Sequence, residues 1–268
     1  LDPINDSVPG MSVDKAYTEL IKDSEGQTVV VAVLDTGIDI KHEDLKGNIW
    51  TNKKEIPGNN IDDDKNGFVD DVYGWNFLGE AYYEQLELTR LLGKGEDFPE
   101  KEDAQKDYDK RLAEARGEET LKYYLNYDFK GRTTGDDPDN FEQTYYGDNK
   151  VEHSREDESH GTHVAGIIAA ARNNNLGMKG VANNVEIMTL RVVPYGDEYD
   201  KDVALGIVYA ADNGADIINT SFGKGFSPHS DKVRDAIAYA ASKNVLIVNA
   251  AGNDLSLIHI SEPTRPSV

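Results

Sequence analysis

In the second half of the chain, short apolar segments alternate with longer segments of helical periodicity, and this alternation limits the possible folds more than any other feature. Strands are expected at residues 185–193, 216–222 and 245–250, with helices between them at residues 202–212 and 230–243. Such alternation favours a parallel sheet with right-handed crossover helices on its faces. We therefore expect a three-layer, doubly wound α/β fold whose sheet is mostly parallel.

An earlier segment predicts one more strand of this sheet. Residues 29–34 form an uninterrupted apolar run that ends at Asp35-Thr36-Gly37, and such a run is typical of a parallel strand buried on both faces. Asp35 then lies at the carboxyl edge of the sheet, where open α/β folds bind their ligands. The local pattern leaves a second interpretation open, in which Asp35 only caps the turn that follows.

A histidine opens the next informative segment, which is built almost wholly of small and apolar residues. Ser159 is a natural N-cap, and the apolar residues after it recur at helical spacing, so we expect a helix with one face toward a core; these residues are Val164, Ile167, Ile168 and Ala171. A lone histidine in this place is ordinarily a core or capping residue, but polar residues at the sheet edge offer His160 partners. His163 lies inside the apolar run and is expected to be a core histidine.

The last predicted strand leads through Ala250-Ala251-Gly252 to Asn253. This asparagine therefore arrives at the same sheet edge as Asp35. An amide at such an edge can donate a hydrogen bond to a developing oxyanion. An asparagine after Ala-Gly is also a common turn residue, and the local sequence leaves both interpretations open.

Composition excludes several classes of function. The formal net charge of −22 argues against nucleic acid or an anionic membrane surface as a partner, and it favours cations and basic ligands. The chain has no cysteine, and so no disulfide, thiol nucleophile or thiolate metal site. It lacks a run of about 18 apolar residues that would predict a membrane span. The first residues show no signal-peptide pattern, so we expect the chain to begin downstream of a targeting segment.

An acidic loop at residues 59–71 places oxygen-bearing side chains at alternate positions around Gly67, a pattern that favours Ca²⁺. Asp62, Asp64 and Asn66 match the first ligand positions of a helix-flanked calcium loop, but Tyr73 stands where its bidentate glutamate belongs. We expect Asp70 or Asp71 to supply the replacement carboxylate. An acidic turn without a cation is the alternative.

Two further segments lie outside the alternating pattern. Residues 80–158 are acidic and rich in tyrosine, with a narrow apolar stripe that predicts a helical lobe before a polar loop at residues 131–140; the stripe is Ala104, Tyr108, Leu112 and Ala115. Its apolar residues are too few for a second core, so we interpret this segment as an insertion. Residues 1–28 are polar with one short helical candidate and are expected to form a docking arm.

Four motifs, taken in order, resemble those of the subtilisin-like serine peptidases. They are Val33-Leu34-Asp35-Thr36-Gly37-Ile38, His160-Gly161-Thr162-His163-Val164-Ala165-Gly166, Asn219-Thr220-Ser221-Phe222-Gly223 and Ala250-Ala251-Gly252-Asn253. The resemblance covers nearly everything from Val29 to Asn253 apart from the insertion, and it implies a subtilisin-like fold.

The resemblance also implies roles within an Asp-His-Ser catalytic triad. Asp35 would orient His160 and stabilise its cationic form, His160 would take the proton of a serine hydroxyl, and Asn253 would donate to the oxyanion. The segment that pairs with the extended backbone of a polypeptide substrate would be Ser221, Phe222 and Gly223, in which Ser221 is not the nucleophile.

Calcium is implied at a second place by the same resemblance. Asp44, in the segment His42-Glu43-Asp44-Leu45, and Asn174, in the loop at residues 172–178, are similar to the ligands of a tight calcium site in this family. We rank this site above the acidic loop.

The sequence departs from the family after the fourth motif. The nucleophile motif, of the type Gly-Thr-Ser-Met-Ala, is not found, and Ser256, Ser261 and Ser267 lack its context. Residues 255–265 look like an in-frame translation of a transposase adapter used in DNA library preparation. We therefore expect residues 29–254 to be a partial catalytic domain, incomplete at its C-terminus, and residues 255–268 to be a non-native tail.

The leading hypothesis is a calcium-stabilised serine endopeptidase, seen here as an inactive fragment. We expect a polypeptide substrate, a monomer, and a location outside the cytoplasm. A peptide-binding pseudopeptidase is the first alternative, because it would lack the serine naturally. A metal-dependent hydrolase using His160 and His163 is the second, and it lacks a third ligand placed by the sequence.

Overall fold

The computed structural model describes residues 10–22, 24, 26–152, 155 and 158–252. In this part of the chain, five strands form one sheet in the order β2-β3-β1-β4-β5, and every neighbouring pair is parallel. The strands are β1 (Val29–Asp35), β2 (Gly74–Asn76), β3 (Val185–Arg191), β4 (Ile217–Thr220) and β5 (Leu246–Asn249). The predicted parallel sheet is confirmed. Strand β2 was not predicted, because three residues are too few to show periodicity.

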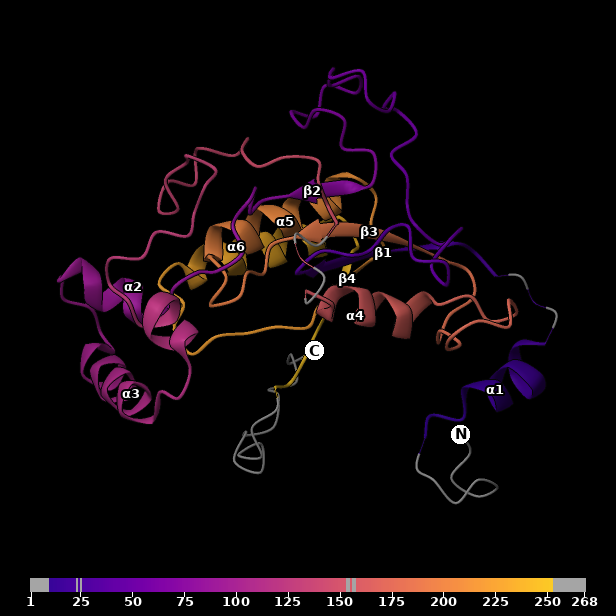
Figure 1. Ribbon diagram of the computed structural model, residues 1–268. Coiled ribbons are helices and arrows are strands. Elements are labelled where there is room, and N and C mark those ends of the chain that lie inside the picture. Colours follow the sequence, from indigo (N-terminus) through magenta and orange to yellow (C-terminus); the bar gives the residue numbers. More distant parts are fainter. Residues whose placement is uncertain (1–9, 23, 25, 153–154, 156–157, 253–268) are drawn as a thin grey trace, which may run out of the picture.

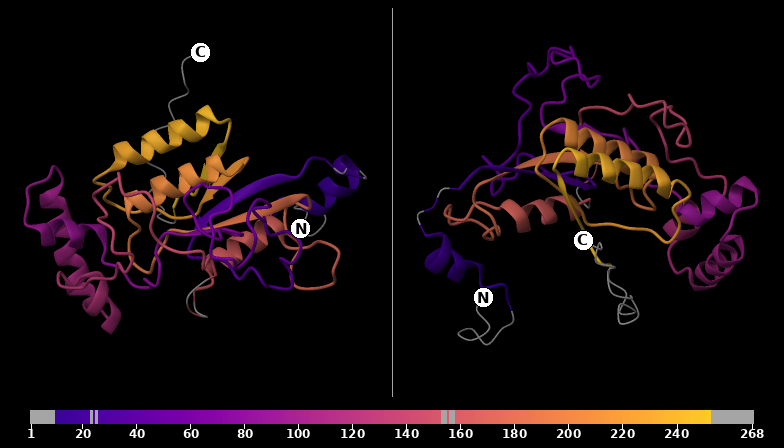
Figure 2. Two further views of the ribbon diagram at one scale, coloured as in Figure 1. Left: turned by 90° about the horizontal axis from the view of Figure 1, so that it is seen from above. Right: turned by 180° about the vertical axis from the view of Figure 1, so that it is seen from behind.

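Helices cover the sheet on both faces, as Figure 1 and the view from above in Figure 2 show. The helix α4 (His160–Ala169) packs on one face against β1 and β3, whereas α5 (Asp200–Asp212) and α6 (Ser230–Ser242) pack together on the other. This is the three-layer, doubly wound α/β architecture that the alternation predicted.

Strand β1 is buried on both faces by these two layers. Ala32 and Leu34 belong to the core shared with α5 and α6, while Val31 and Val33 belong to the core beneath α4. All four side chains are at most 5% exposed. The valine-rich run therefore reflects two separate cores that meet at one strand.

Helix α4 differs from its prediction in which residues it buries. Its small residues Gly161, Ala165 and Ala169 are buried, whereas Ile167 is 51% exposed. His163 is exposed, so the prediction of a core histidine was wrong. Ser159 occupies the N-cap position but makes no side-chain capping hydrogen bond. Small residues face the sheet because they let the helix axis approach it closely.

The predicted insertion contains a small helical lobe, visible at the left of Figure 1. It consists of α2 (Glu87–Lys94), α3 (Lys101–Glu114) and η2 (Thr120–Tyr124), packed around a small core of Leu88, Ala104, Tyr108 and Leu125. Leu112 of the predicted stripe is 44% exposed.

Buried ion pairs attach the polar loop after this lobe to α5. Arg132 forms hydrogen bonds of 2.9 and 3.0 Å with the Asp202 carboxylate, and Asp136 accepts one of 2.5 Å from the Lys201 ammonium. Lys201 and Asp202 are fully buried. Buried charged residues thus help to hold the insertion against the sheet domain, beside the apolar contact of Tyr146 with the main core.

The N-terminal helical segment lies beside the loop that follows α4. It consists of α1 (Val13–Ala16) and η1 (Tyr17–Ile21). The Tyr17 hydroxyl donates to the Val181 carbonyl at 3.0 Å, and Asp14 accepts from Arg172. In the described residues, no helix is long and apolar enough to cross a membrane.

Leu246 and Val248 are exposed apolar residues on β5, at 59% and 49%. In the sheet register they align through β4 with Val31 and Val33, which places them on the face that carries α4. Because α4 packs on β1 and β3, it leaves this part of the face open.

We predict that the 268-residue chain self-associates through this surface, because an apolar edge strand pairs readily with other chains. Leu246→Lys combined with Val248→Lys should raise the monomer fraction in light scattering coupled to size exclusion. Ile56→Lys with Leu121→Lys, at residues that are 61% and 53% exposed elsewhere, is the control and should have no effect. An equal rise in the monomer fraction for both double variants would contradict the prediction.

Candidate active site

Asp35 and His160 meet at the carboxyl edge of β1. The His160 Nδ1 atom lies 2.8 and 3.0 Å from the two oxygens of the Asp35 carboxylate. Asp35 is 1% exposed, but the His160 side chain is 57% exposed, so a reacting group can approach the imidazole from solvent. An Nδ1–H that donates to Asp35 leaves Nε2 as the basic nitrogen.

Backbone hydrogen bonds fix the Asp35 carboxylate in place. Its Oδ1 atom accepts a hydrogen bond of 2.8 Å from the Thr36 amide. The Asp35 carbonyl accepts from the amides of Val192 and Val193, at 2.9 and 3.2 Å, just after β3. The sheet therefore fixes the backbone of Asp35, and the Thr36 amide orients its carboxylate.

Gly161 permits the first turn of α4 to reach the turn after β1. A Cβ atom at this residue would lie 2.2 Å from the Gly37 carbonyl oxygen, so only glycine fits. The Gly161 amide donates to the Thr36 hydroxyl at 3.3 Å, and the Thr162 hydroxyl accepts from the Asp39 amide at 2.9 Å. These contacts seat His160 against Asp35.

The predicted substrate-binding residues lie next along the same edge. Ser221, Phe222 and Gly223 directly follow β4, whose last residue, Thr220, is in register with Leu34 of β1. Within the described ranges, their backbone groups make no hydrogen bond to other backbone groups. An extended peptide can therefore pair with them. Asn253 lies outside the described residues.

The acidic loop brings together two of the predicted ligands, Asp62 and Asp64, and one residue that was not predicted, Glu55. Glu55, Asp62 and Asp64 each offer a carboxylate oxygen, and these three atoms lie within 4.8 Å of one another. Burial is the main cause that raises the pKa of Glu55, and the neighbouring acids add to it. Three carboxylates at this spacing repel one another, and they fit the hard, oxygen-bound character of Ca²⁺.

Of the other predicted ligands of this loop, Asp70 is not part of that carboxylate group, and Asn66 lies beside it, because its backbone amide donates to Asp62 and Asp64 at 3.1 Å. The Asp70 carboxylate accepts from the backbone amides of residues 58–60 at 2.7 to 3.3 Å, so it braces the loop. Asn66 donates to Asp71 at 2.9 Å and accepts from the Phe68 amide at 2.8 Å. Glu55 was missed because it precedes the acidic run and carries no sequence signal of its own.

The structure also brings together Asp44 and Asn174, the residues of the second predicted calcium site. The Asn174 side-chain amide donates to Asp44 Oδ1 at 2.7 Å, and the Met178 amide donates to Asp44 Oδ2 at 3.2 Å. Asp44 is 4% exposed. One carboxylate and one amide oxygen suit a calcium ion but provide less negative charge than the acidic loop.

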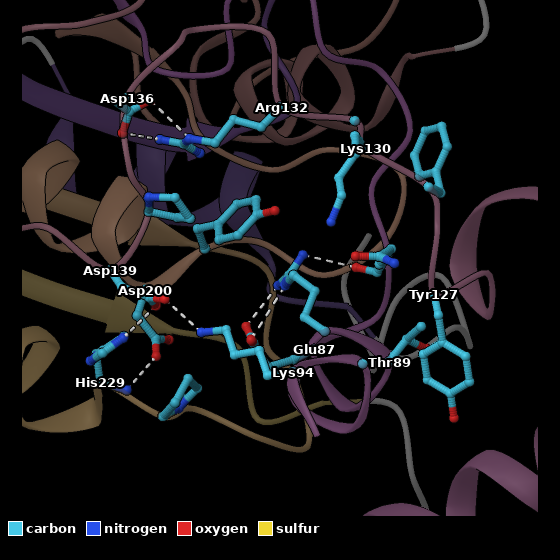
Figure 3. Close-up of a pocket in the computed structure, with 18 of the residues that line it drawn as sticks. Glu87, Thr89, Lys94, Tyr127, Lys130, Arg132, Asp136, Asp139, Asp200 and His229 are labelled. Carbon is cyan, nitrogen blue, oxygen red and sulfur yellow. Dashed lines mark hydrogen bonds and ion pairs between the residues drawn. The ribbon is translucent and has the colours of Figure 1, made fainter. Parts of the chain in front are cut away.

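A cavity of about 510 Å³ lies between α2, the loop at residues 127–139 and the start of α6 (Figure 3). No residue of the predicted active site lines it. Arg90, one of its walls, uses all five N–H groups on Glu87 and three backbone carbonyls. The Arg90 guanidinium is therefore fully paired within the protein.

The family model described as the subtilase family matches residues 26–267, so the chain belongs to the subtilase family of peptidases. The matched range includes residues of the predicted non-native tail, which lie outside the described part of the chain.

Individual relatives cover different parts of the chain. It is 27% identical over 240 residues to subtilisin-like protease 1 of Plasmodium falciparum, with 88% of this chain and 24% of that protein aligned. It is 43% identical over 100 residues to the cell wall-associated protease of Bacillus subtilis, with 37% and 11% aligned. The chain thus spans a quarter or less of the length of these relatives.

A solved structure titled S41 psychrophilic protease is similar over 91% of this chain and 52% of that chain, with 21% identity and a TM-score of 0.47.

Glu198 is a buried carboxyl group with an unusual protonation equilibrium. Burial raises its pKa from 4.5 to about 7. Below pH 4.5 the group is protonated in both folded and unfolded chains. Between pH 4.5 and 7 the unfolded chain loses the proton first, so the free energy of unfolding falls by about 3 kcal/mol over this interval.

We predict that Glu198→Gln removes this loss. The variant should match the parent chain at pH 4 and be more stable by about 3 kcal/mol at pH 8, measured by urea unfolding. Glu96→Gln, at an exposed position, should change neither value. Equal stability of Glu198→Gln and the parent chain at pH 8 would show that the group ionises normally.

Proposed function

We propose that the protein is a serine-type endopeptidase in which Asp35 is the aspartate of the triad and His160 is its base. The observation that carries this proposal is the contact of 2.8 Å between His160 Nδ1 and Asp35, at the carboxyl edge of a parallel sheet. Membership of the subtilase family supports the reaction type, because the two residues occupy the family's motifs.

The geometry suits the proton transfers of peptide hydrolysis. A serine hydroxyl oxygen attacks the peptide carbonyl carbon, and its proton moves to His160 Nε2. The Asp35 carboxylate stabilises the resulting imidazolium, which then gives the proton to the leaving amine. Asn253 would donate to the oxyanion, and residues 221–223 would hold the substrate backbone.

The chain as given would lack the nucleophile, since no family-type serine motif follows Asn253. We propose that it is a fragment of a longer peptidase and is inactive alone, with residues 255–268 foreign to the gene. The uninterrupted gene sequence beyond Asp254 decides this directly. A gene that continues without a nucleophile motif would instead indicate a peptide-binding pseudopeptidase.

The hydrolase that uses His160 and His163 as metal ligands gains no support from the site. In the described residues, the one cluster of three metal-ligating side chains is Glu55, Asp62 and Asp64, which contains no histidine. His160 Nδ1 is already engaged by Asp35.

We further propose structural calcium at the acidic loop, held by Glu55, Asp62 and Asp64, and at the Asp44 and Asn174 pair. The ion would neutralise carboxylates that otherwise repel one another. For the product of the uninterrupted gene we also propose a monomer. We propose that it is located outside the cytoplasm, in line with the name of the cell wall-associated relative.

In the product of the uninterrupted gene, Asp35→Asn should lower kcat for peptide hydrolysis about 10⁴-fold, as loss of this charge does in other serine peptidases. Asp39→Asn, four residues further along, is the control and should retain activity. The 268-residue chain alone should hydrolyse no peptide. Full activity of Asp35→Asn in a fluorogenic peptide assay would refute the proposed triad.

Calcium titration by calorimetry tests the acidic loop. Asp62→Asn should weaken binding at one site about tenfold or more and reduce the gain in Tm on adding calcium, because it removes a ligand charge. Asp63→Asn is the matched control, since the Asp63 carboxylate bonds Ile56 and Asn59 and lies outside the ligand group. Identical isotherms for both variants would contradict a calcium site in this loop.

A further inference from the structure

Arg191, the last residue of β3, is a buried cation directly beside Asp35, the aspartate of the proposed triad. It is in register with Asp35 across the β1–β3 pair, and it is 1% exposed. A guanidinium taken out of water costs several kcal/mol unless its N–H groups find acceptors. The hydrogen-bond acceptors of Arg191 therefore show what this buried cation does in the fold.

The guanidinium connects several segments that surround the active site. Its Nε donates to the Thr36 carbonyl at 2.9 Å, next to Asp35. One terminal nitrogen donates to the Gly79 carbonyl at 3.0 Å. The other donates at 2.9 Å both to the Ala81 carbonyl and to the Glu158 carboxylate.

Glu158 is the partner that links this cation to the base. It is fully buried and lies two residues before His160, where α4 begins. Asp35 and His160 are 125 residues apart in the sequence, so non-covalent contacts alone set their relative position. The Arg191–Glu158 pair connects the turn that carries Asp35 to the segment that carries His160.

We propose that the Arg191–Glu158 ion pair is a positioning device that holds His160 Nδ1 at hydrogen-bond distance from Asp35. Neither residue touches the reacting atoms. The proposal deepens the proposed function and rests on it, because it assigns the two residues a part in building the same triad.

The charge of the Arg191 and Glu158 contacts favours this role over a merely structural one. Among the described residues, the Gly161 amide also donates to the Thr36 hydroxyl at 3.3 Å and the Asp39 amide to the Thr162 hydroxyl at 2.9 Å, and both of these bonds join neutral groups. The Arg191 bonds to Thr36 and Glu158 are both 2.9 Å and charge-assisted at Glu158. Loss of these guanidinium hydrogen bonds would release the start of α4 but leave the backbone pairing of the strands intact.

The test separates positioning from stability with two replacements in the product of the uninterrupted gene. Arg191→Lys keeps the positive charge but loses the planar guanidinium that donates to several partners at once. Arg191→Met with Glu158→Leu removes both charges, and its urea unfolding is measured beside that of Arg132→Lys because it leaves the Thr36, Gly79 and Ala81 carbonyls without their donor. The probe is the low-field proton NMR resonance of the His160 Nδ1–H, assigned by its loss in His160→Ala.

Both replacements should abolish or shift this resonance and lower kcat about 10- to 100-fold with KM nearly unchanged, since small displacements of catalytic groups cost this much. Arg132→Lys is the matched control, because Arg132 is a buried arginine paired with Asp136 and Asp202 away from the site. It should lose stability but keep the resonance and kcat.

The NMR readout separates failure of the positioning role from failure of the proposed function. A resonance that persists unshifted in both replacements overturns the positioning role, whether or not peptide is hydrolysed. If the parent protein hydrolyses no peptide, the proposed function fails, and the resonance still decides the role of Arg191 and Glu158. Loss of the resonance in Arg132→Lys as well would also overturn the proposal, since the effect would then follow general destabilisation.

Discussion

The contact between a buried carboxylate and an exposed imidazole at the edge of the sheet is the interaction on which the candidate site depends. Asp35 is held in place by the sheet, because backbone amides bond both its carbonyl and its side chain. His160 arrives from a helix on one face of that sheet. The sheet therefore keeps Asp35 rigidly placed, and the close approach of α4 at Gly161 brings His160 within hydrogen-bond distance of it. Catalytic geometry of this kind requires rigid elements, which a loop alone does not provide.

Charge is arranged very unevenly in this acidic chain. With a net charge of −22, most carboxylates can remain in water, but a minority are buried with cations between the sheet domain and the inserted segments. Arg132 with Asp202, and Lys201 with Asp136, attach the polar loop to α5. Such pairs contribute little net stability compared with apolar packing, but breaking one leaves an unpaired buried charge. These ion pairs therefore determine the position at which the insertion docks on the sheet domain.

The parts of the fold carried by long periodic segments were predictable from the sequence. The run at residues 29–34 and the two crossover helices followed from periodicity, and the rule that parallel strands share a carboxyl edge placed Asp35 there. The meeting of Asp35 with His160 was implied by the resemblance to the subtilisin-like peptidases. Features set by tertiary contacts were not. Arg191 is one charge in an apolar run, and Glu55 precedes the acidic loop, so neither partner is visible in the sequence. The exposure of His163 depends on what covers α4, which local pattern does not encode.

The acidic loop is coupled to the sheet through a buried hydrogen-bond chain. Asp71 is fully buried and accepts from the Tyr209 hydroxyl of α5 at 2.5 Å, and from Asn52 and Asn66 at 2.9 Å. Burial and the neighbouring Asp71 raise the pKa of Tyr209 well above its ordinary value, so the phenol remains a donor. Asn52 also donates to Asp64, a member of the carboxylate group. A cation bound there would favour the folded chain and the docking of this loop on α5, because a ligand that binds the native state stabilises it.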